Sequence, residues 1–227
     1  MVITGIGSMK GSIAKTFKIL ESSDNVISRM TSDEAPKGSS YQLLQLKSAG
    51  RTKKSITIRW KKIKGAAKYV IYGNKCGRKN KMKKLKVVSK RKASLKKVGA
   101  KKIKKGTYYK FLVVAVDRMG RVLSISKTVH IVTKGGKYGN DKKVITEASD
   151  GRVTLKRGAR FALDARPIPQ SSKHPVQRHR RMKYESSNNK IARVTKKGVI
   201  KAMRTGSCRV YAYTQNGVCA RINVTVR

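Results

Sequence analysis

Apolar and polar residues alternate along many short segments of this chain, and this alternation constrains its fold more than any other feature. The pattern covers residues 56–60, 109–115, 209–212 and 222–226. A period of two is typical of β-strands with one buried face. Stripes with helical spacing are nearly absent, and the only rival is a lysine-rich stretch, residues 90–105, which has glycine near its end. We therefore predict an all-β fold with many short strands.

Positive charge is the second feature, and it is concentrated in the middle of the chain. The 227 residues include 57 Lys and Arg against 10 Asp and Glu, a net charge of +47. Residues 41–135 alone carry 30 basic residues and one acidic residue, Asp117, whereas residues 1–40 are nearly balanced. The basic residues are interleaved with apolar ones, unlike those of a disordered tail. This pattern indicates a folded protein whose partners are polyanions.

The composition argues against several classes of protein. No run of about 18 apolar residues is present, so we expect no membrane insertion. Residues 1–18 lack the basic start and apolar run of a signal peptide. Three cysteines are too few for a disulfide scaffold, and ten scattered carboxylates leave little for calcium sites. We expect no cofactor.

Two segments divide the chain into blocks. Gly135-Gly136 separates two strand-rich blocks, and residues 21–40 contain few apolar residues. We interpret residues 41–135 and 136–227 as two domains, each near the size of an immunoglobulin-like β-sandwich, about 100 residues. Residues 21–40 are expected to form a linker, and the Gly-Gly junction indicates some freedom between the two domains.

Three segments of the middle block match one known family. Residues 55–60, which end in Trp60, resemble the second strand of a fibronectin type III domain, and residues 64–72 resemble its third strand. Residues 103–109 resemble the turn before strand F, where Tyr109 would be the tyrosine corner whose hydroxyl bonds to backbone. Trp60 and Tyr109 lie on the apolar phase of their strands, which favours core positions over a stacking platform for sugars or bases.

The last block contains a different ordered series of motifs. It runs through residues 184–188, 191–194, 198–202 and Gly206 to a closing hairpin over residues 208–226. This series resembles bacterial immunoglobulin-like domains of group 2, although that family often has Trp where Tyr184 stands. The tandem arrangement resembles modules of surface proteins from Gram-positive bacteria, which implies an extracellular or cell-surface location.

The first residues of the chain also resemble part of such a module. Residues 2–7 and 13–19 are similar to the closing hairpin of another bacterial immunoglobulin-like repeat. Because a two-stranded hairpin is marginal alone, we interpret residues 1–20 as the remnant of a truncated upstream repeat. The signal peptide would then lie in the missing upstream region. The alternative is an ordinary N-terminal hairpin that packs on the next domain.

No arrangement of side chains in the sequence predicts an enzyme. His130 lies in an alternating run and is expected to be a strand residue. His174 and His179 lie in an arginine-rich loop, where cationic repulsion disfavours a metal. The segment Lys134-Gly-Gly-Lys137 lacks the spacing of a phosphate-binding loop. We expect no catalytic residues and no metal site.

The three cysteines are expected to remain free thiols. Cys208 shares the strand phase of Val210 and should point inward, whereas Cys219 is out of phase with Ile222 and should point outward. Side chains on opposite faces of a hairpin have diverging Cβ vectors and cannot form a disulfide. Cys76 lies in the other block.

The basic runs supply the candidate binding site. They fall on the outward phases and connections of a sandwich, where lysine, a hydrated point charge, suits non-specific attraction. A polyanion would bind there largely through counterion release. The candidate polyanion-binding residues are Lys79, Lys81, Lys83, Lys84, Lys86, Lys101, Lys102, Lys104, Lys105, Arg178, Arg180 and Arg181.

These features favour a non-enzymatic, extracellular modular protein that acts as a spacer, adhesion or wall-attachment module. The family resemblance implies that its partner is teichoic acid, another anionic wall polymer or a host glycan.

One alternative is an intracellular nucleic-acid-binding β protein of low specificity, for which Tyr211 and Tyr213 are outward stacking candidates. However, the sequence has no aromatic strand of the RNP type and no zinc knuckle. Another alternative is that the charge serves only solubility. The ligand and the oligomeric state stay open.

Overall fold

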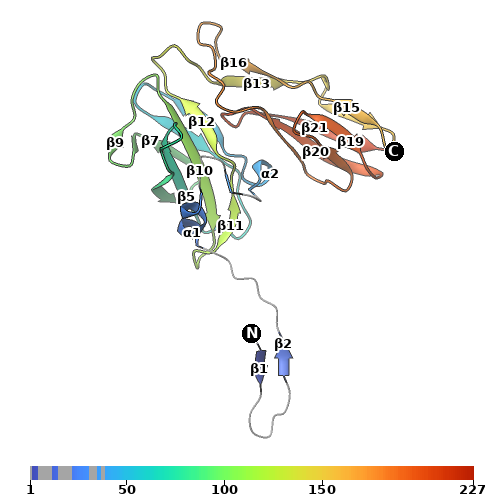
Figure 1. The fold of residues 1–227 in the computed structure, drawn as a ribbon, viewed down its shortest axis with the longest axis horizontal. Helices are drawn as coiled ribbons and strands as arrows, with labels where there is room; N and C mark the ends of the chain where they lie inside the picture. Colours follow the sequence, from blue (N-terminus) through green and yellow to red (C-terminus); the bar gives the residue numbers. More distant parts are fainter. Residues whose placement is uncertain (1, 5–11, 15–21, 31–34, 37–38) are drawn as a thin grey trace.

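The computed structural model describes residues 2–4, 12–14, 22–30, 35–36 and 39–227 (Figure 1). Its regular structure is almost entirely β-strand, which confirms the predicted all-β fold. Strands β1 (Val2–Thr4) and β2 (Ser12–Ala14) pair antiparallel, and the rest of the predicted N-terminal hairpin lies outside the described residues. The helices in the described part, α1 (Ser23–Ser28) and α2 (Tyr41–Leu44), are too short to cross a membrane.

The first sandwich consists of strands β3 to β12. One sheet has the order β3-β4-β7, and the other has the order β11-β10-β5-β6 with β12 also paired to β10. Antiparallel sheets in this arrangement make a fibronectin type III-like sandwich. The bounds are β3 (Lys47–Arg51), β4 (Ile56–Arg59), β5 (Lys68–Lys75), β6 (Lys83–Val88), β7 (Lys92–Leu95), β8 (Lys97–Val98), β9 (Lys101–Lys102), β10 (Tyr108–Val116), β11 (Val122–Ile125) and β12 (Val129–Val132).

The interior of the first sandwich confirms the predicted positions of Trp60 and Tyr109. Both side chains are buried in one apolar cluster with Ile56 and Phe111. The backbone N–H of Lys104 donates a hydrogen bond to the Tyr109 hydroxyl at 2.9 Å. This bond is the tyrosine corner expected from the sequence, and it fixes the turn that leads into β10.

The outer face of the larger sheet is covered by α1, which lies in the segment expected to be a linker. Ile27 packs against Val70 and Tyr72 of β5. The Tyr72 hydroxyl donates to Asp24 at 2.5 Å, and Lys84 forms an ion pair with the same carboxylate at 2.8 Å. The central strand β10 is buried along its whole length, so other parts of the protein must pack against both of its faces. Helix α1 packs against part of the face that points away from the core between the two sheets.

The second sandwich consists of strands β13 to β21. One sheet has the order β14-β21-β20-β17, with β14 parallel to β21, the other has the order β15-β19-β18, and β13 pairs with β16. The bounds are β13 (Asp141–Ile145), β14 (Arg152–Leu155), β15 (Arg160–Ala162), β16 (Arg166–Pro169), β17 (Lys183–Ser186), β18 (Ala192–Val194), β19 (Val199–Ala202), β20 (Gly206–Tyr213) and β21 (Cys219–Val226).

No disulfide joins the cysteines in the described part of the chain, as predicted. Cys208 is buried in the core of the second sandwich with Val210 and Val224. Cys219 lies on the opposite face of the hairpin, but this face is covered, and Cys219 packs against Tyr213. Burial raises the pKa of the Cys219 thiol, while nearby lysines and Arg221 act in the opposite direction.

The prediction that Tyr211 and Tyr213 face outward was wrong. Both are buried where the second sandwich meets the first, and the Tyr41 ring stacks on Tyr213 with 4.4 Å between ring centroids. The carboxylate of Glu185 accepts hydrogen bonds from the backbone N–H groups of Tyr41 and Gln42, at 2.8 Å and 2.6 Å. A side chain of β17 therefore caps the first turn of α2, and neither tyrosine offers a stacking platform.

Glycines allow the two sandwiches to approach closely. A Cβ atom at Gly217, in the turn between β20 and β21, would collide with the carbonyl oxygen of Leu46. A Cβ atom at Gly136 would lie 2.5 Å from the Cα atom of Gly106. The contact at Gly217 places the second sandwich against the first, and the contact at Gly136 packs the connecting segment on the first sandwich, in contrast to the freedom expected from the Gly-Gly junction.

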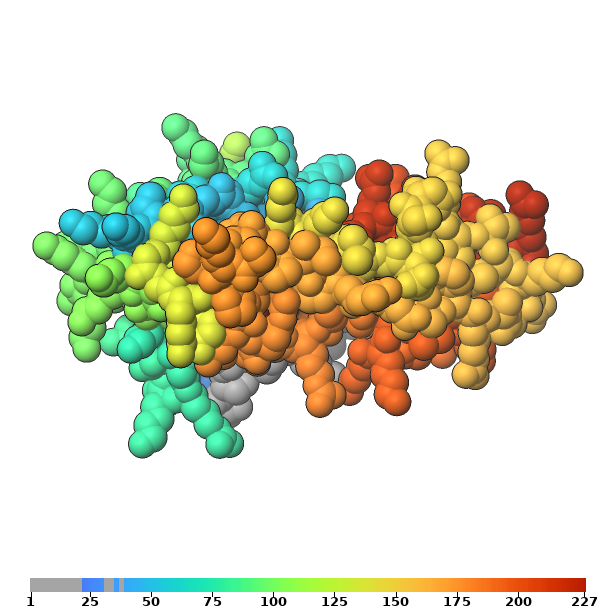
Figure 2. Space-filling view, turned by 90° about the horizontal axis from the view of Figure 1, so that it is seen from above, coloured from blue at the N-terminus to red at the C-terminus, as the bar shows by residue number. Residues whose placement is uncertain are grey.

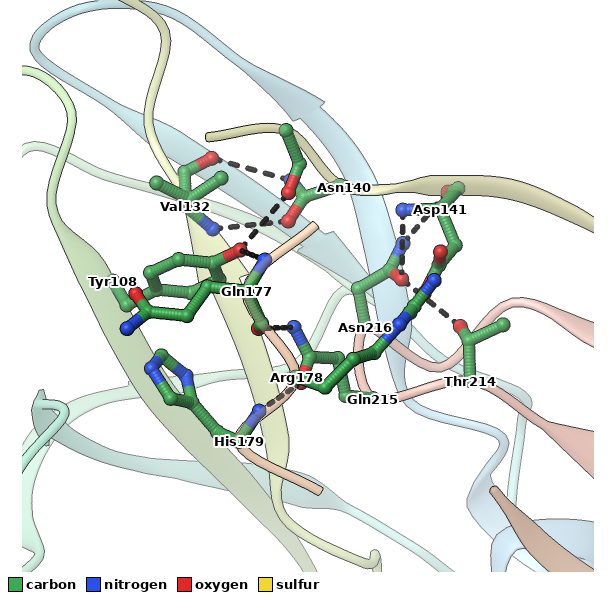
Figure 3. A network of polar contacts seen from close by, with 11 residues as sticks. Tyr108, Val132, Asn140, Asp141, Gln177, Arg178, His179, Thr214, Gln215 and Asn216 are labelled. Atoms are coloured by element: carbon green, nitrogen blue, oxygen red, sulfur yellow. Dashed lines mark hydrogen bonds and ion pairs between the residues drawn. The ribbon is translucent and has the colours of Figure 1, made fainter. Parts of the chain in front are cut away.

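A network of polar contacts completes the junction. Figure 2 shows the segment between β16 and β17, in orange, lying across the boundary between the two sandwiches. The Tyr108 hydroxyl donates to the Gly139 carbonyl at 3.0 Å and accepts from the Gln177 N–H at 3.2 Å (Figure 3). Arg178 forms a 2.6 Å ion pair with Asp141, whose side chain is fully buried. The junction therefore joins both sandwiches by apolar and polar contacts.

Candidate polyanion-binding surface

The predicted lysines of the first sandwich lie at one edge of the larger sheet and on the connections beside it. Strand β6 forms the edge, and Lys83, Lys84 and Lys86 are exposed on it. Lys79 and Lys81 are exposed on the loop between β5 and β6. An edge strand that is rich in lysine resists pairing with another sheet, so this placement explains part of the charge without a ligand.

The structure gathers several of these lysines around a cavity of about 180 Å³. Its basic lining residues are Lys75, Lys101, Lys102 and Lys104, and Val98 and Tyr109 line it as well. Lys83 extends toward the same hairpin, since a Cβ atom at Gly99 would lie 3.8 Å from its Cδ atom. Lys101, Lys102 and Lys104 therefore lie together at this cavity, and they are joined by Lys75, which was not among the candidates from the sequence.

Other predicted residues point elsewhere. Lys84 is on the face covered by α1, where its contact with Asp24 holds the pKa of that carboxyl below its usual value. Lys105 lies near Lys53 beside Gly135. The lysine candidates thus form no single continuous patch.

The three predicted arginines line a cavity of about 360 Å³ at the junction of the sandwiches. Two of them serve the junction itself, because Arg178 is paired with Asp141 and Arg180 donates to the Thr128 carbonyl at 2.8 Å. Arg181 is exposed at the same cavity. The arginine cluster is therefore partly a structural link between the two sandwiches.

The structure also brings together a set of cations that the sequence did not reveal. Lys47, Arg59 and Lys92 lie directly opposite one another across β3, β4 and β7, because Arg59 pairs with Lys47 on one side and Lys92 on the other. We call these residues the cationic row. Like charges directly opposite on a sheet destabilise it, so the row has unfavourable electrostatics unless an anion is near.

The cationic row lines a cavity of about 490 Å³, together with Lys61 and Arg91. Trp60 lines the same cavity, and its indole Nε1 atom is buried with no hydrogen-bond partner in the described part of the chain. A buried N–H without an acceptor costs free energy. The cavity therefore combines five basic side chains with an aromatic side chain that has an unused donor.

The acidic side chains of the described residues do not balance these cations. No carboxylate is among the lining residues of the three cavities. Asp24, Asp117 and Glu147 make ion pairs elsewhere, whereas Asp141 pairs with Arg178 of the third cavity. Glu185 caps α2, and its burial raises its pKa despite those hydrogen bonds. An anion from outside the chain would therefore meet little competition at the cavities of about 490 Å³ and 180 Å³.

The comparisons with known proteins give fold-level similarities only. No family model matches the chain, and no curated protein matches it. Among solved structures, the fibronectin type III domain of a human fibronectin type III domain containing protein 3 is 16% identical, with a TM-score of 0.33, and the match covers 40% of this chain and 86% of that chain.

Two further structures show the range of these matches. The fn3 domain of human collagen alpha-1(XX) chain is 14% identical, with a TM-score of 0.33, over 46% of this chain and 99% of that chain. A C-terminal fragment of intimin, solved with the intimin-binding domain of its translocated receptor, is 16% identical, with a TM-score of 0.28, over 80% and 63%. At such TM-scores the matches carry no functional argument, so the fold assignment rests on the strand order and the tyrosine corner.

Proposed function

We propose that this chain is a non-enzymatic, extracellular module that attaches to anionic polymers of the cell surface, such as teichoic acid or a glycan. The observation that carries the proposal is the cationic row, Lys47, Arg59 and Lys92, which lines a cavity without a carboxylate. An anionic group bound there would relieve the repulsion between the three cations. The cavity around Lys101, Lys102 and Lys104 provides a second contact for the same long polymer.

The modular organisation is part of the same proposal. Residues 41–135 and 136–227 act as a fibronectin type III-like module and a module of the bacterial immunoglobulin-like group 2 type. The contacts at Tyr41, Tyr213 and Gly217 support a fixed arrangement of the two modules. A fixed pair presents its cations at constant spacing, which favours binding to a repeating polymer.

The test is co-sedimentation of the full chain with purified Gram-positive cell walls, with and without teichoic acid, over a salt series. We expect binding that requires the teichoic acid and weakens with salt, because counterion release makes polyanion binding salt-dependent. Binding should survive an excess of duplex DNA. Absence of binding at low salt would contradict the proposal.

Paired variants locate the site. The double variant Arg59→Thr, Lys92→Thr should weaken binding and lower the slope of log K against log salt by about 2. The matched control is Lys142→Thr, Lys143→Thr, which removes the same charge from exposed positions of β13. Equal effects of the two variants would show that net charge alone binds the polymer. Loss of wall binding in the presence of excess duplex DNA at every salt concentration would favour the nucleic-acid alternative.

A further inference from the structure

Three potential metal ligands from distant parts of the chain meet at the junction of the sandwiches. Cys76, His130 and His179 each offer one ligand atom, and these atoms all lie within 4.8 Å of one another. Cys76 follows β5, and His130 lies in β12, both in the first sandwich. His179 belongs to the segment between β16 and β17 of the second. The cluster therefore exists only when the two sandwiches are joined.

Hydrogen bonds of the backbone hold all three residues in place. The N–H of Cys76 donates to the Tyr108 carbonyl at 2.9 Å. Gln215 positions both histidines, because its carbonyl accepts from the His130 N–H at 2.8 Å and its side-chain oxygen accepts from the His179 N–H at 3.0 Å. Backbone hydrogen bonds therefore position His130 within β12 and Cys76 and His179 in the segments that connect strands.

The rings themselves are also positioned. The His179 ring packs edge-on against Tyr108, with 4.4 Å between ring centroids and an interplanar angle of 79° (Figure 3). The centroids of the His130 and His179 rings are 5.7 Å apart. His130 is only 3% exposed, whereas Cys76 is half-buried and His179 is exposed. One side of the cluster is therefore packed and the other opens to solvent, as metal entry requires.

We propose that Cys76, His130 and His179 form a Zn²⁺ site, with the Sγ atom of Cys76 and one ring nitrogen from each histidine as ligands and a water molecule as the fourth. Thiolate and imidazole are the ligands that zinc prefers, and three protein ligands with one open position make a common zinc geometry. Ligands of a tetrahedral zinc ion lie about 3.3–3.7 Å apart. The present spacing of up to 4.8 Å would have to shorten to that value when the metal binds.

The charge of one lysine opposes metal binding at this site. Lys110 is buried beside it, and its Nζ atom donates to the carbonyl of Gly77, the neighbour of Cys76. A lysine ammonium repels a divalent cation, so the bonds from one thiolate and two imidazoles must outweigh this repulsion. This inference replaces the expectation of no metal site, which considered His179 only with His174.

The experiment is a titration of the full chain, without a histidine tag and after metal removal, with Co²⁺ as a spectroscopic substitute for Zn²⁺. We expect one equivalent to produce a thiolate-to-cobalt charge-transfer band and the visible bands of a tetrahedral ion. Excess Zn²⁺ should remove both sets of bands. In the wild type, Zn²⁺ should shift the NMR signals of the His130 and His179 rings and leave those of His174 unchanged.

Matched variants decide whether this cluster is the site. Cys76→Ser should abolish the charge-transfer band, and His179→Asn should weaken binding by more than the roughly 10–100-fold that loss of an outer-shell partner costs. Cys219→Ser and His174→Asn, which lie outside the cluster, should bind Co²⁺ like the wild type. No tetrahedral bands at excess Co²⁺, or bands that persist in Cys76→Ser, would overturn the proposal.

Discussion

A single hydroxyl group fixes the turn that leads into the central strand of the first sandwich. The Tyr109 hydroxyl accepts from the Lys104 N–H, and Tyr109→Phe would leave that N–H without its acceptor. We expect a loss of about 1–3 kcal/mol in the free energy of unfolding, measured by denaturant unfolding. Tyr211→Phe is the control, because its hydroxyl has no hydrogen bond within the described residues. Equal losses in both variants would refute the role of the corner.

A single carboxyl group should make stability depend on pH. Burial raises the pKa of Glu185 above its usual value. The folded state then binds the proton more tightly than the unfolded state, so the contribution of Glu185 is complete below the unfolded pKa and is lost as pH rises through the folded pKa. A tenfold difference in proton affinity corresponds to about 1.4 kcal/mol.

The variant Glu185→Gln isolates this effect. The difference in unfolding free energy between the wild type and the variant should be largest at acid pH and should shrink as pH rises. Denaturant unfolding between about pH 4 and pH 7 measures it, a range that runs from near the usual carboxyl pKa to well above it. The control is Glu147→Gln, at an exposed ion pair with Arg166. A difference that grows with pH would show that the hydrogen bonds from Tyr41 and Gln42 outweigh burial.

At the scale of strands, register decides which charges meet. Arg59 lies between Lys47 and Lys92 in adjacent strands, so Arg59→Thr should stabilise the protein in the absence of a polyanion. The expected gain is about 0.2–1 kcal/mol at low salt, and it should vanish near 1 M salt, where the screening length is about 3 Å. Thermal unfolding at both salt concentrations tests this.

The control for the cationic row is a lysine with an uncharged partner. Lys143 lies opposite Ile168, so Lys143→Thr removes one charge without relieving a cross-strand repulsion. It should change stability less than Arg59→Thr at low salt. A similar gain in both variants would mean that the net charge of the whole chain, rather than the row, destabilises the fold.

At the scale of the whole molecule, substitutions at two glycines distinguish the effect of the contact between the sandwiches from the effect of backbone strain. Gly217 and Gly120 both have positive φ, at +82° and +78°, but only a Cβ atom at Gly217 would meet the other sandwich. We expect Gly217→Ala to loosen the junction and to increase the radius of gyration and the maximum dimension measured by small-angle X-ray scattering in solution. Gly120→Ala should cost only the strain of about 1–3 kcal/mol and should keep the wild-type dimensions. Unchanged dimensions in Gly217→Ala would show that the junction tolerates the added atom.

Much of the fold was predictable because each strand carries its own signal. The alternation around Trp60 and the phase of Cys208 depend only on local sequence and the pleat of a strand. Tyr109 was predictable for the same reason, since its motif is contiguous. In contrast, Tyr211 and Tyr213 were predicted to face outward, because alternation identifies two faces of a strand but not which of them another domain covers.

The candidate sites follow the same division. Contiguous lysine runs identified Lys101, Lys102 and Lys104, which do share a cavity. The cationic row was missed because its members are far apart in the chain and meet only through strand register. The cluster of Cys76, His130 and His179 was missed because its members are far apart in the chain and His179 belongs to the other sandwich.

The sequence by itself determined the all-β class, the inward faces of the strands and the sign of the surface charge. These properties follow from side-chain period and composition, which are local or additive. Only the tertiary structure decided the contact of Tyr41 with Tyr213, the row of Lys47, Arg59 and Lys92, and the meeting of Cys76 with two histidines. Each of these depends on how separate strands pair and how two sandwiches dock, and no local pattern encodes that geometry.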